Sequence, residues 1–366
     1  MRSCDWFKTC FCVALLIGLP LAGIRAAGWD IGPYLEFPPV TRYVAHAPFN
    51  WGVFLFIAAL DLLMLLGLIL LLKKKSKPPQ RPEAVKKGTP FPSWGWWGVI
   101  LMLAGWFLAW TRQPWFEILQ EHTFCIPWAG YILTANALCE KRSGRSLLTD
   151  APGRFAMLFP ASAIFWWFFE YLNRFVQNWY YIQASDFSPA GYTLLASMAF
   201  STVLPAVLST HRLLLTFSLF NSRLIGGPEI RPAFGRMPAV MALLAAAVGL
   251  ALIGIFPDYL YPLVWFAPLV IIVSLQSLGD RTTLLTDLRG GDWRLIVPPA
   301  CAALICGFFW EMWNFYSLTR WAYTVSYVDR YHIFALPLLG YGSYLLFGLE
   351  CLAIGQLVVG WQALKG

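Results

Sequence analysis

Long apolar stretches recur along this chain of 366 residues, from about residue 11 to about residue 361. A stretch of about 20 apolar residues is long enough to cross a bilayer as a helix. Lipid cannot satisfy exposed backbone groups, so spanning segments are helices or closed barrels. Charged residues make up only 13% of the chain, well below the ~25% usual in soluble domains. The pattern therefore predicts an all-α integral membrane protein and excludes a soluble fold.

The sequence predicts about ten transmembrane helices. Their expected ranges are 11–24, 51–72, 95–111, 122–139, 154–172, 189–210, 236–256, 259–279, 295–314 and 334–361. This divides the chain into two N-terminal helices (1–72), a basic linker (73–93) and two four-helix units (94–215 and 236–366). The first helix could instead be a cleaved signal peptide, but Ala26-Ala27-Gly28 is a weak cleavage site and an uncleaved helix is favoured.

A short motif occurs once in each four-helix unit and indicates a duplication. Residues 166–173 read WWFFEYLN and residues 307–314 read GFFWEMWN, and each copy leads into a Trp-x-Tyr segment, at 179–181 and 321–323. Similar matches in the same order surround both copies. Because each unit has an even number of helices, we expect parallel repeats related by a pseudo-two-fold axis along the membrane normal.

The distribution of basic residues predicts the topology. Seven of the 27 Lys and Arg residues lie between Lys73 and Lys87, and such clusters mark cytoplasmic loops. Alternating ten helices from this loop places both termini in the cytoplasm, in a plasma (bacterial inner) membrane. We expect the linker to contact anionic lipid. Basic residues confined to short loops argue against a nucleic-acid partner, and protein partners stay undefined.

Two glutamates are the first candidate catalytic residues. Glu170 and Glu311 each stand three positions before an asparagine, so carboxylate and amide share one helical face. Paired carboxyl groups in an aromatic pocket could donate a proton. The candidate ligand-binding residues are Asn173, Asn314, Trp179, Tyr181, Trp321 and Tyr323. Two other interpretations stay open: a packing device that links the units, and an interfacial belt of aromatic residues.

Glu350 is the third candidate catalytic residue. It lies near the middle of the last apolar segment, where an ionisable group is costly and usually functional. Its equivalent in the first unit is Ser201, so Glu350 breaks the internal symmetry. The alternative is a protonated carboxyl bonded to a neighbouring helix. For Asp61, midway along the second helix, a helix–helix hydrogen bond is the favoured interpretation.

Three function classes are consistent with these features. The first is a membrane enzyme that handles a lipid or isoprenoid-like substrate by acid catalysis from the paired glutamates. The second is a proton-coupled transporter of a small or apolar solute, and the third a non-catalytic membrane subunit. The first is favoured, while enzymatic activity itself stays open. The four histidines are scattered over different loops and no Cys/His cluster occurs, so we expect neither a cofactor nor a metal site.

Overall fold

The computed structural model describes residues 3–39, 41–73, 89–183, 187–230, 236–279 and 282–365. Over these ranges the chain is helical, with only two pairs of very short strands. The longer helices are α1 (Ser3–Ala26), α3 (Trp51–Lys73), α4 (Ser93–Trp110), α5 (Cys125–Ser143), α7 (Pro152–Val176), α8 (Pro189–Phe200), α9 (Val203–Leu214), α10 (Arg236–Leu252), α12 (Ala267–Leu278), α13 (Val297–Phe315) and α14 (Tyr341–Val359). Each of the ten predicted segments therefore contains a helix. Residues 74–88 of the basic linker, with their expected lipid contact, lie outside the described residues.

Shorter helical elements connect or extend these helices. The α-helical ones are α2 (Gly32–Leu35), α6 (Leu147–Asp150), α11 (Pro257–Leu260) and α15 (Trp361–Lys365). The 3-10 turns are η1 (Pro114–His122), η2 (Ser222–Leu224), η3 (Tyr261–Trp265), η4 (Thr286–Gly290) and η5 (Leu338–Gly340).

Five helices are long and apolar enough to cross a membrane, which indicates a membrane protein. They span Trp51–Lys73, Ser93–Trp110, Pro152–Val176, Pro189–Leu214 and Leu338–Val359. A sixth span results if the bent pair Pro257–Trp265 and Ala267–Leu278 is counted as one. The larger number of about ten stays a prediction.

The predicted segment 259–279 is not one straight helix. Its two parts meet at an angle of 54°, and prolines stand at the second positions of both η3 and α12 (Pro262 and Pro268). Proline has no backbone N–H, so it begins a helix well and cannot continue one. The segment 189–210 comprises α8 and α9, which together form the single candidate span Pro189–Leu214.

The predicted last helix begins later than expected. Residues 332–337 form the strand pair β3 (His332–Ile333) and β4 (Leu336–Pro337), so α14 starts at Tyr341 rather than near residue 334. Apolar residues alone do not distinguish this short hairpin from a first helical turn.

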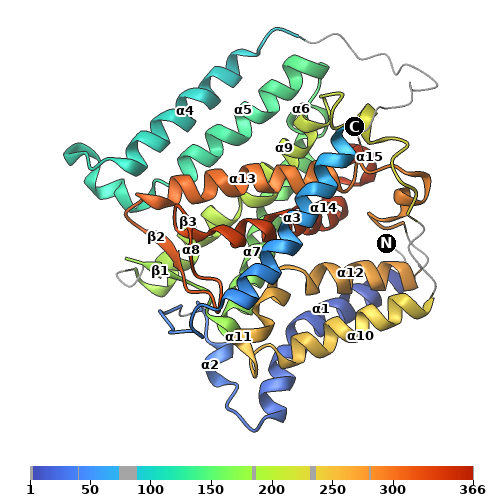
Figure 1. Ribbon diagram of the computed structural model, residues 1–366. Coiled ribbons are helices and arrows are strands. Elements are labelled where there is room, and N and C mark those ends of the chain that lie inside the picture. Colours follow the sequence, from blue (N-terminus) through green and yellow to red (C-terminus); the bar gives the residue numbers. More distant parts are fainter. Residues whose placement is uncertain are drawn as a thin grey trace.

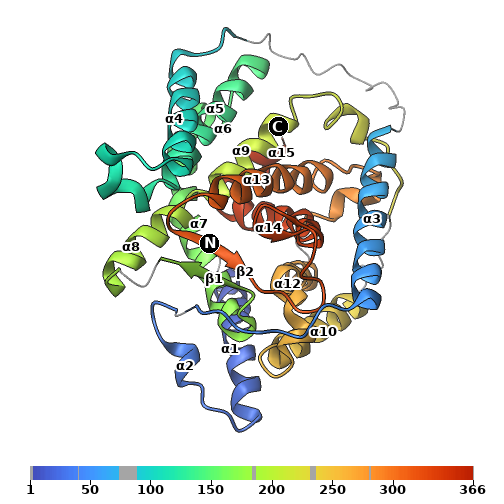
Figure 2. The ribbon, with the colours of Figure 1, turned by 60° about the vertical axis from the view of Figure 1, so that its left-hand side comes forward.

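The helices pack as a central bundle with pairs of helices on either side (Figure 1). In the centre α13 packs against α14 and α9, and α7 packs against α9 and α14. On one side α4 lies along α5, and on the other α10 lies along α12 and α1. Helix α3 lies at the edge of the bundle (Figure 2).

A short antiparallel ladder joins the two Trp-x-Tyr segments. Strand β1 (Trp179–Ile182) pairs with β2 (Arg320–Tyr323). Trp179 lies opposite Tyr323, and Tyr181 lies opposite Trp321. The first residue of each segment is therefore paired with the third residue of the other, so segments 142 positions apart in sequence lie side by side.

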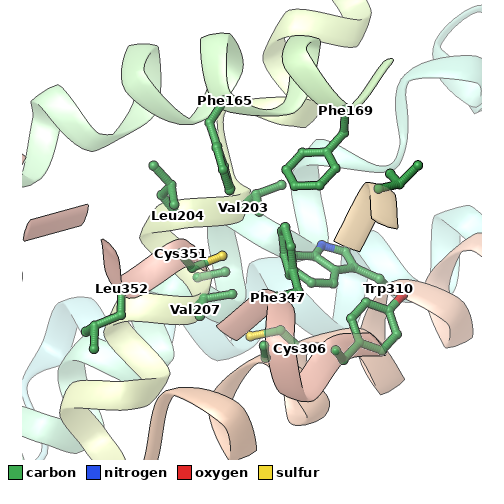
Figure 3. Packing of buried hydrophobic residues seen from close by; sticks show 14 of the residues in the cluster. Phe165, Phe169, Val203, Leu204, Val207, Cys306, Trp310, Phe347, Cys351 and Leu352 are labelled. Atoms are coloured by element: carbon green, nitrogen blue, oxygen red, sulfur yellow. The ribbon is translucent and has the colours of Figure 1, made fainter. Parts of the chain in front are cut away.

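The core between the central helices is rich in aromatic rings. Phe347 of α14 is fully buried, with ring centroids of Phe165, Phe169 and Trp310 at 5.8, 5.5 and 6.2 Å. Figure 3 shows these rings from α7, α13 and α14 meeting beside Val203 and Val207 of α9. This packing fixes the helices that carry Glu170 and Glu311.

Candidate functional site

Glu170 lies in the last turns of α7 and has no solvent exposure. Its Oε1 accepts three hydrogen bonds: from Trp166 Nε1 (3.1 Å), Trp179 Nε1 (3.0 Å) and the Tyr181 hydroxyl (2.6 Å). Trp166 stands four positions earlier on the same helix, and the other two donors come from β1. Among the described residues Oε2 has no hydrogen-bond partner. All three donors therefore converge on one carboxyl oxygen.

Glu311 has a related but different environment in α13, also with no exposure. Its Oε1 accepts hydrogen bonds from the hydroxyls of Tyr323 (2.7 Å) and Tyr344 (2.9 Å). Trp321 donates to the hydroxyl of Tyr323 instead of to the carboxyl group, at 2.8 Å. Within the described part of the chain, Oε2 is again without a partner. Both glutamates are thus bonded by the Trp-x-Tyr strand that follows their motif.

The two asparagines of the motifs hold these strands in place. Asn173 Nδ2 donates to the carbonyl of Trp179 (2.8 Å), and its Oδ1 accepts from the amide of Asn178 (2.8 Å). Asn314 Nδ2 donates to the carbonyl of Trp321 (2.8 Å), and its Oδ1 accepts from the Trp321 amide (2.9 Å). Both ends of each amide are therefore used to position strand backbone next to the glutamates.

Glu350 lies apart from this arrangement. It is 1% exposed, and its Oε1 accepts a hydrogen bond from the backbone N–H of Leu269 (3.2 Å), the third residue of α12. The first N–H groups of a helix have no partner within the helix. A carboxyl group at that end also interacts favourably with the helix dipole. Glu350 thus caps the N-terminus of α12, just after the 54° bend.

One large cavity, of about 600 Å³, lies beside the strand pair. Its wall contains every donor to the two glutamates, together with Trp321: Trp166, Trp179, Tyr181, Trp321, Tyr323 and Tyr344. Neither glutamate belongs to the wall. The carboxyl groups therefore stand behind a layer of aromatic side chains that come from both motifs and face a single space. A volume of this size is typical of small-molecule sites.

Most of the remaining wall is apolar, and much of it comes from α3 and α8. From α3 come Val53, Phe56, Ile57, Leu60, Asp61 and Met64. Elsewhere α3 is widely exposed: Leu55, Leu62, Leu63 and Leu70 are each at least 60% exposed. Asp61 lies against Gly342 of α14, where an added Cβ would come within 2.1 Å of Asp61 Oδ1. Helix α3 is thus one side wall of the cavity.

Two tyrosine hydroxyls in this wall, those of Tyr181 and Tyr323, are protonated donors. The strands lie outside the membrane-spanning helices, and burial raises the pKa of both Tyr181 and Tyr323 well above the ordinary value. The neighbouring glutamates, Glu170 and Glu311, raise it further. Each hydroxyl therefore keeps its proton and presents it to a carboxyl oxygen.

Sequence reasoning identified the glutamates and the strand aromatics but missed two of their donors. Trp166 was inside the first motif, at the i−4 position that reaches Glu170 on a helix. Tyr344 has no equivalent in the first unit, because Leu195 takes its place when the Gly-Tyr pairs are aligned. No pattern in the sequence links Tyr344 to Glu311, 33 positions away.

Among the described residues, no cluster of three or more His, Cys, Asp or Glu side chains is arranged to hold a metal ion.

Comparisons with protein-family models, with curated proteins and with solved structures found no match to this chain.

Proposed function

We propose that this is a multi-pass membrane protein that binds a lipid or isoprenoid-like molecule in the shared cavity. The observation that carries the proposal is that the hydrogen-bond donors to both glutamates line one predominantly apolar space. An apolar wall favours a hydrocarbon ligand because its burial releases water from apolar surface. The few polar groups between the rings would fix the orientation of the ligand.

The position of α3 supports entry of such a ligand from the bilayer. This helix has the highest mean hydropathy of the candidate spans, 2.9. One of its faces lines the cavity and other parts of its surface are exposed. In a membrane that exposed surface would contact lipid, so an apolar molecule could pass beside α3 without crossing water. The proposed ligand class and the proposed route are therefore consistent.

Acid catalysis by the paired glutamates is the reaction we propose for this site. Because the glutamates stand behind the wall, a proton would reach the ligand through a tyrosine hydroxyl, Tyr181 in one motif and Tyr323 or Tyr344 in the other. For this step the carboxyl group must be protonated: the hydroxyl would give its proton to the ligand and regain one from the carboxyl group behind it, which would become a carboxylate. Glu350 is then a structural residue that caps α12.

The proposed architecture has about ten transmembrane helices in two parallel repeats. Its support is the strand ladder, in which equivalent residues exchange places: Trp179 pairs with Tyr323 as Tyr181 pairs with Trp321. Such reciprocal pairing is what a two-fold axis through the ladder produces. The pairs α4–α5 and α10–α12, in each of which two helices of one unit pack together, are consistent with it. The plasma (bacterial inner) membrane and cytoplasmic termini complete the proposal.

The direct test is the lipid composition of cells that contain the gene, lack it, or carry Glu170→Gln with Glu311→Gln. We expect one lipid to disappear in both the deletion and the double variant while a related precursor accumulates. Glu117→Gln is the matched control, since Glu117 is exposed and does not line the cavity. Identical profiles in all strains contradict a catalytic role for the glutamates.

A further inference from the structure

Acidic groups surround the cavity in excess of basic ones. Asp61 and Glu121 belong to the wall, and Glu170 and Glu311 stand directly behind it. Arg320 is the only Lys or Arg among the described residues of the wall, and its Nη1 donates to the carbonyl of Ser317 (3.3 Å). His122 is the single histidine there. The electrostatic balance of the cavity is therefore negative whenever these carboxyl groups are ionised.

Neither buried glutamate forms an ion pair among the described residues, although Arg174, four positions after Glu170 on α7, attracts it electrostatically. Within the described residues, no Lys, Arg or His forms an ion pair with Glu170 or Glu311, and one oxygen of each accepts no hydrogen bond. A buried carboxylate without a cation is costly. A positive charge placed in the neighbouring cavity would offset that cost, because electrostatic interactions are strong where water is excluded.

The aromatic wall is suited to hold such a charge. Trp166 and Trp179 direct their indole N–H groups toward Glu170, behind the wall, so the N–H edges of these two rings face the carboxyl group. A carboxylate at the N–H or O–H edge polarises the ring and increases electron density on its faces. Electron-rich ring faces attract organic cations, tryptophan most strongly.

These observations identify one end of the ligand as positively charged. We propose that the cavity binds an amphiphile with an apolar chain and an organic cation, such as a quaternary ammonium group, held between the aromatic side chains of the two motifs. The chain would lie along the apolar wall formed by α3 and α8. This inference rests on the proposed function and names the class of ligand.

The test compares two ligands of equal shape. One is a hexyl chain that ends in trimethylammonium, and the other is the same chain ending in tert-butyl, which has the same size without the charge. Binding to the purified full-length protein in a maltoside detergent is followed by tryptophan fluorescence, since Trp166, Trp179 and Trp321 line the cavity. We expect the cation to bind about tenfold more tightly, within the range of a desolvated cation–π contact plus nearby carboxylates.

Variants then locate the charge preference. Glu170→Gln with Glu311→Gln should remove most of the preference, and binding of the uncharged ligand to that variant shows whether the cavity is intact. If that variant does not fold, Glu121→Gln serves instead. Glu121 lines the cavity whereas Glu117, in the same 3-10 element, does not. Glu121→Gln should therefore reduce the preference severalfold, and Glu117→Gln should retain it.

The outcomes separate this inference from the proposal on which it rests. If the two ligands bind equally, the inference of a cationic ligand is wrong, while the proposal that the cavity binds an apolar molecule stands. Binding of neither ligand overturns both. A preference that survives in the double glutamine variant and in Glu121→Gln alike also rejects the inference, because the charge would then be recognised elsewhere.

Discussion

Trp321 donates its indole N–H to the hydroxyl of Tyr323 over 2.8 Å, and Tyr323 donates in turn to Glu311. In the first motif the equivalent tryptophan, Trp179, reaches Glu170 directly at 3.0 Å. Successive hydrogen bonds polarise one another, so the bond that Tyr323 accepts from Trp321 makes its hydroxyl a stronger donor to Glu311. The two motifs therefore share a sequence pattern but differ in the acceptor of the tryptophan N–H, which is the carboxyl group in the first and the tyrosine hydroxyl in the second.

This difference predicts unequal effects of two equivalent substitutions. Tyr323→Phe removes a donor to Glu311 and also leaves the Trp321 indole without its acceptor. We therefore expect the free energy of unfolding to fall by about 2–3 kcal/mol. Tyr181→Phe removes one of three donors to Glu170, and we expect about 1 kcal/mol. The free energy of unfolding of each variant, measured in the same detergent, tests this difference. Equal losses would mean that the Trp321–Tyr323 contact does not contribute.

Asn314 is predicted to hold β2 through its amide. Asn314→Ala removes the bonds to both the carbonyl and the amide of Trp321, so hydrogen exchange at residues 320–323 should accelerate by about tenfold or more. Asn314→Asp keeps the acceptor for the Trp321 amide and should have a smaller effect. Exchange that is unchanged in both variants would show that strand pairing with β1 alone positions these residues.

Glu350 is predicted to stabilise the start of α12. Glu350→Leu leaves the Leu269 N–H without a partner in a buried position, and we expect a cost of about 1–3 kcal/mol. Glu350→Gln keeps an acceptor of similar size and should cost well under half of that. Thermal unfolding in detergent distinguishes the two. If Gln is as damaging as Leu, the negative charge matters and the proton-coupled transporter becomes the better interpretation.

The sequence predicts the positions of the helices well, because length and apolarity are local properties. It also identifies Glu170 and Glu311 as candidate functional residues, since the same motif surrounds both. The partner of Glu350 could not be predicted, because Leu269 is 81 positions away in sequence. The backbone N–H of Leu269 lacks a helical partner only because a new helix begins after the bend before α12. A symmetry argument favoured Glu350 as a functional residue; its Oε1 caps α12, and its Oε2 has no hydrogen-bond partner among the described residues.

The cavity itself also lay beyond sequence reasoning. The motif placed an asparagine three residues after each glutamate, which is consistent with a ligand contact, yet both amides bond strand backbone. Hydrophobic periodicity does not resolve four-residue strands such as β1 and β2 within aromatic loops. Their pairing brings the donors of both motifs to one space, and that depends on contacts between distant segments.

Alkaline titration offers a spectroscopic check on the wall of the cavity. Burial, and then the adjacent glutamate, raise the pKa of Tyr181 and of Tyr323. A raised pKa in the folded protein stabilises the fold below the unfolded value of ~10, and this contribution is lost as the pH rises through the folded pKa. Tyr181→Phe and Tyr323→Phe should therefore leave the tyrosinate absorbance change below about pH 11 unaltered. A decrease by one tyrosine in either variant would place that hydroxyl in water.

The most direct measurement is photo-crosslinking from the two motifs in native membranes. A photoreactive phenylalanine analogue replaces Trp179 in one protein and Trp321 in another, with the exposed Trp96 of α4 as control. One shared cavity predicts that positions 179 and 321 label the same lipid species, enriched over the bulk lipids labelled from position 96. Labelling from 179 and 321 in the same proportions as from 96 would contradict a common ligand site.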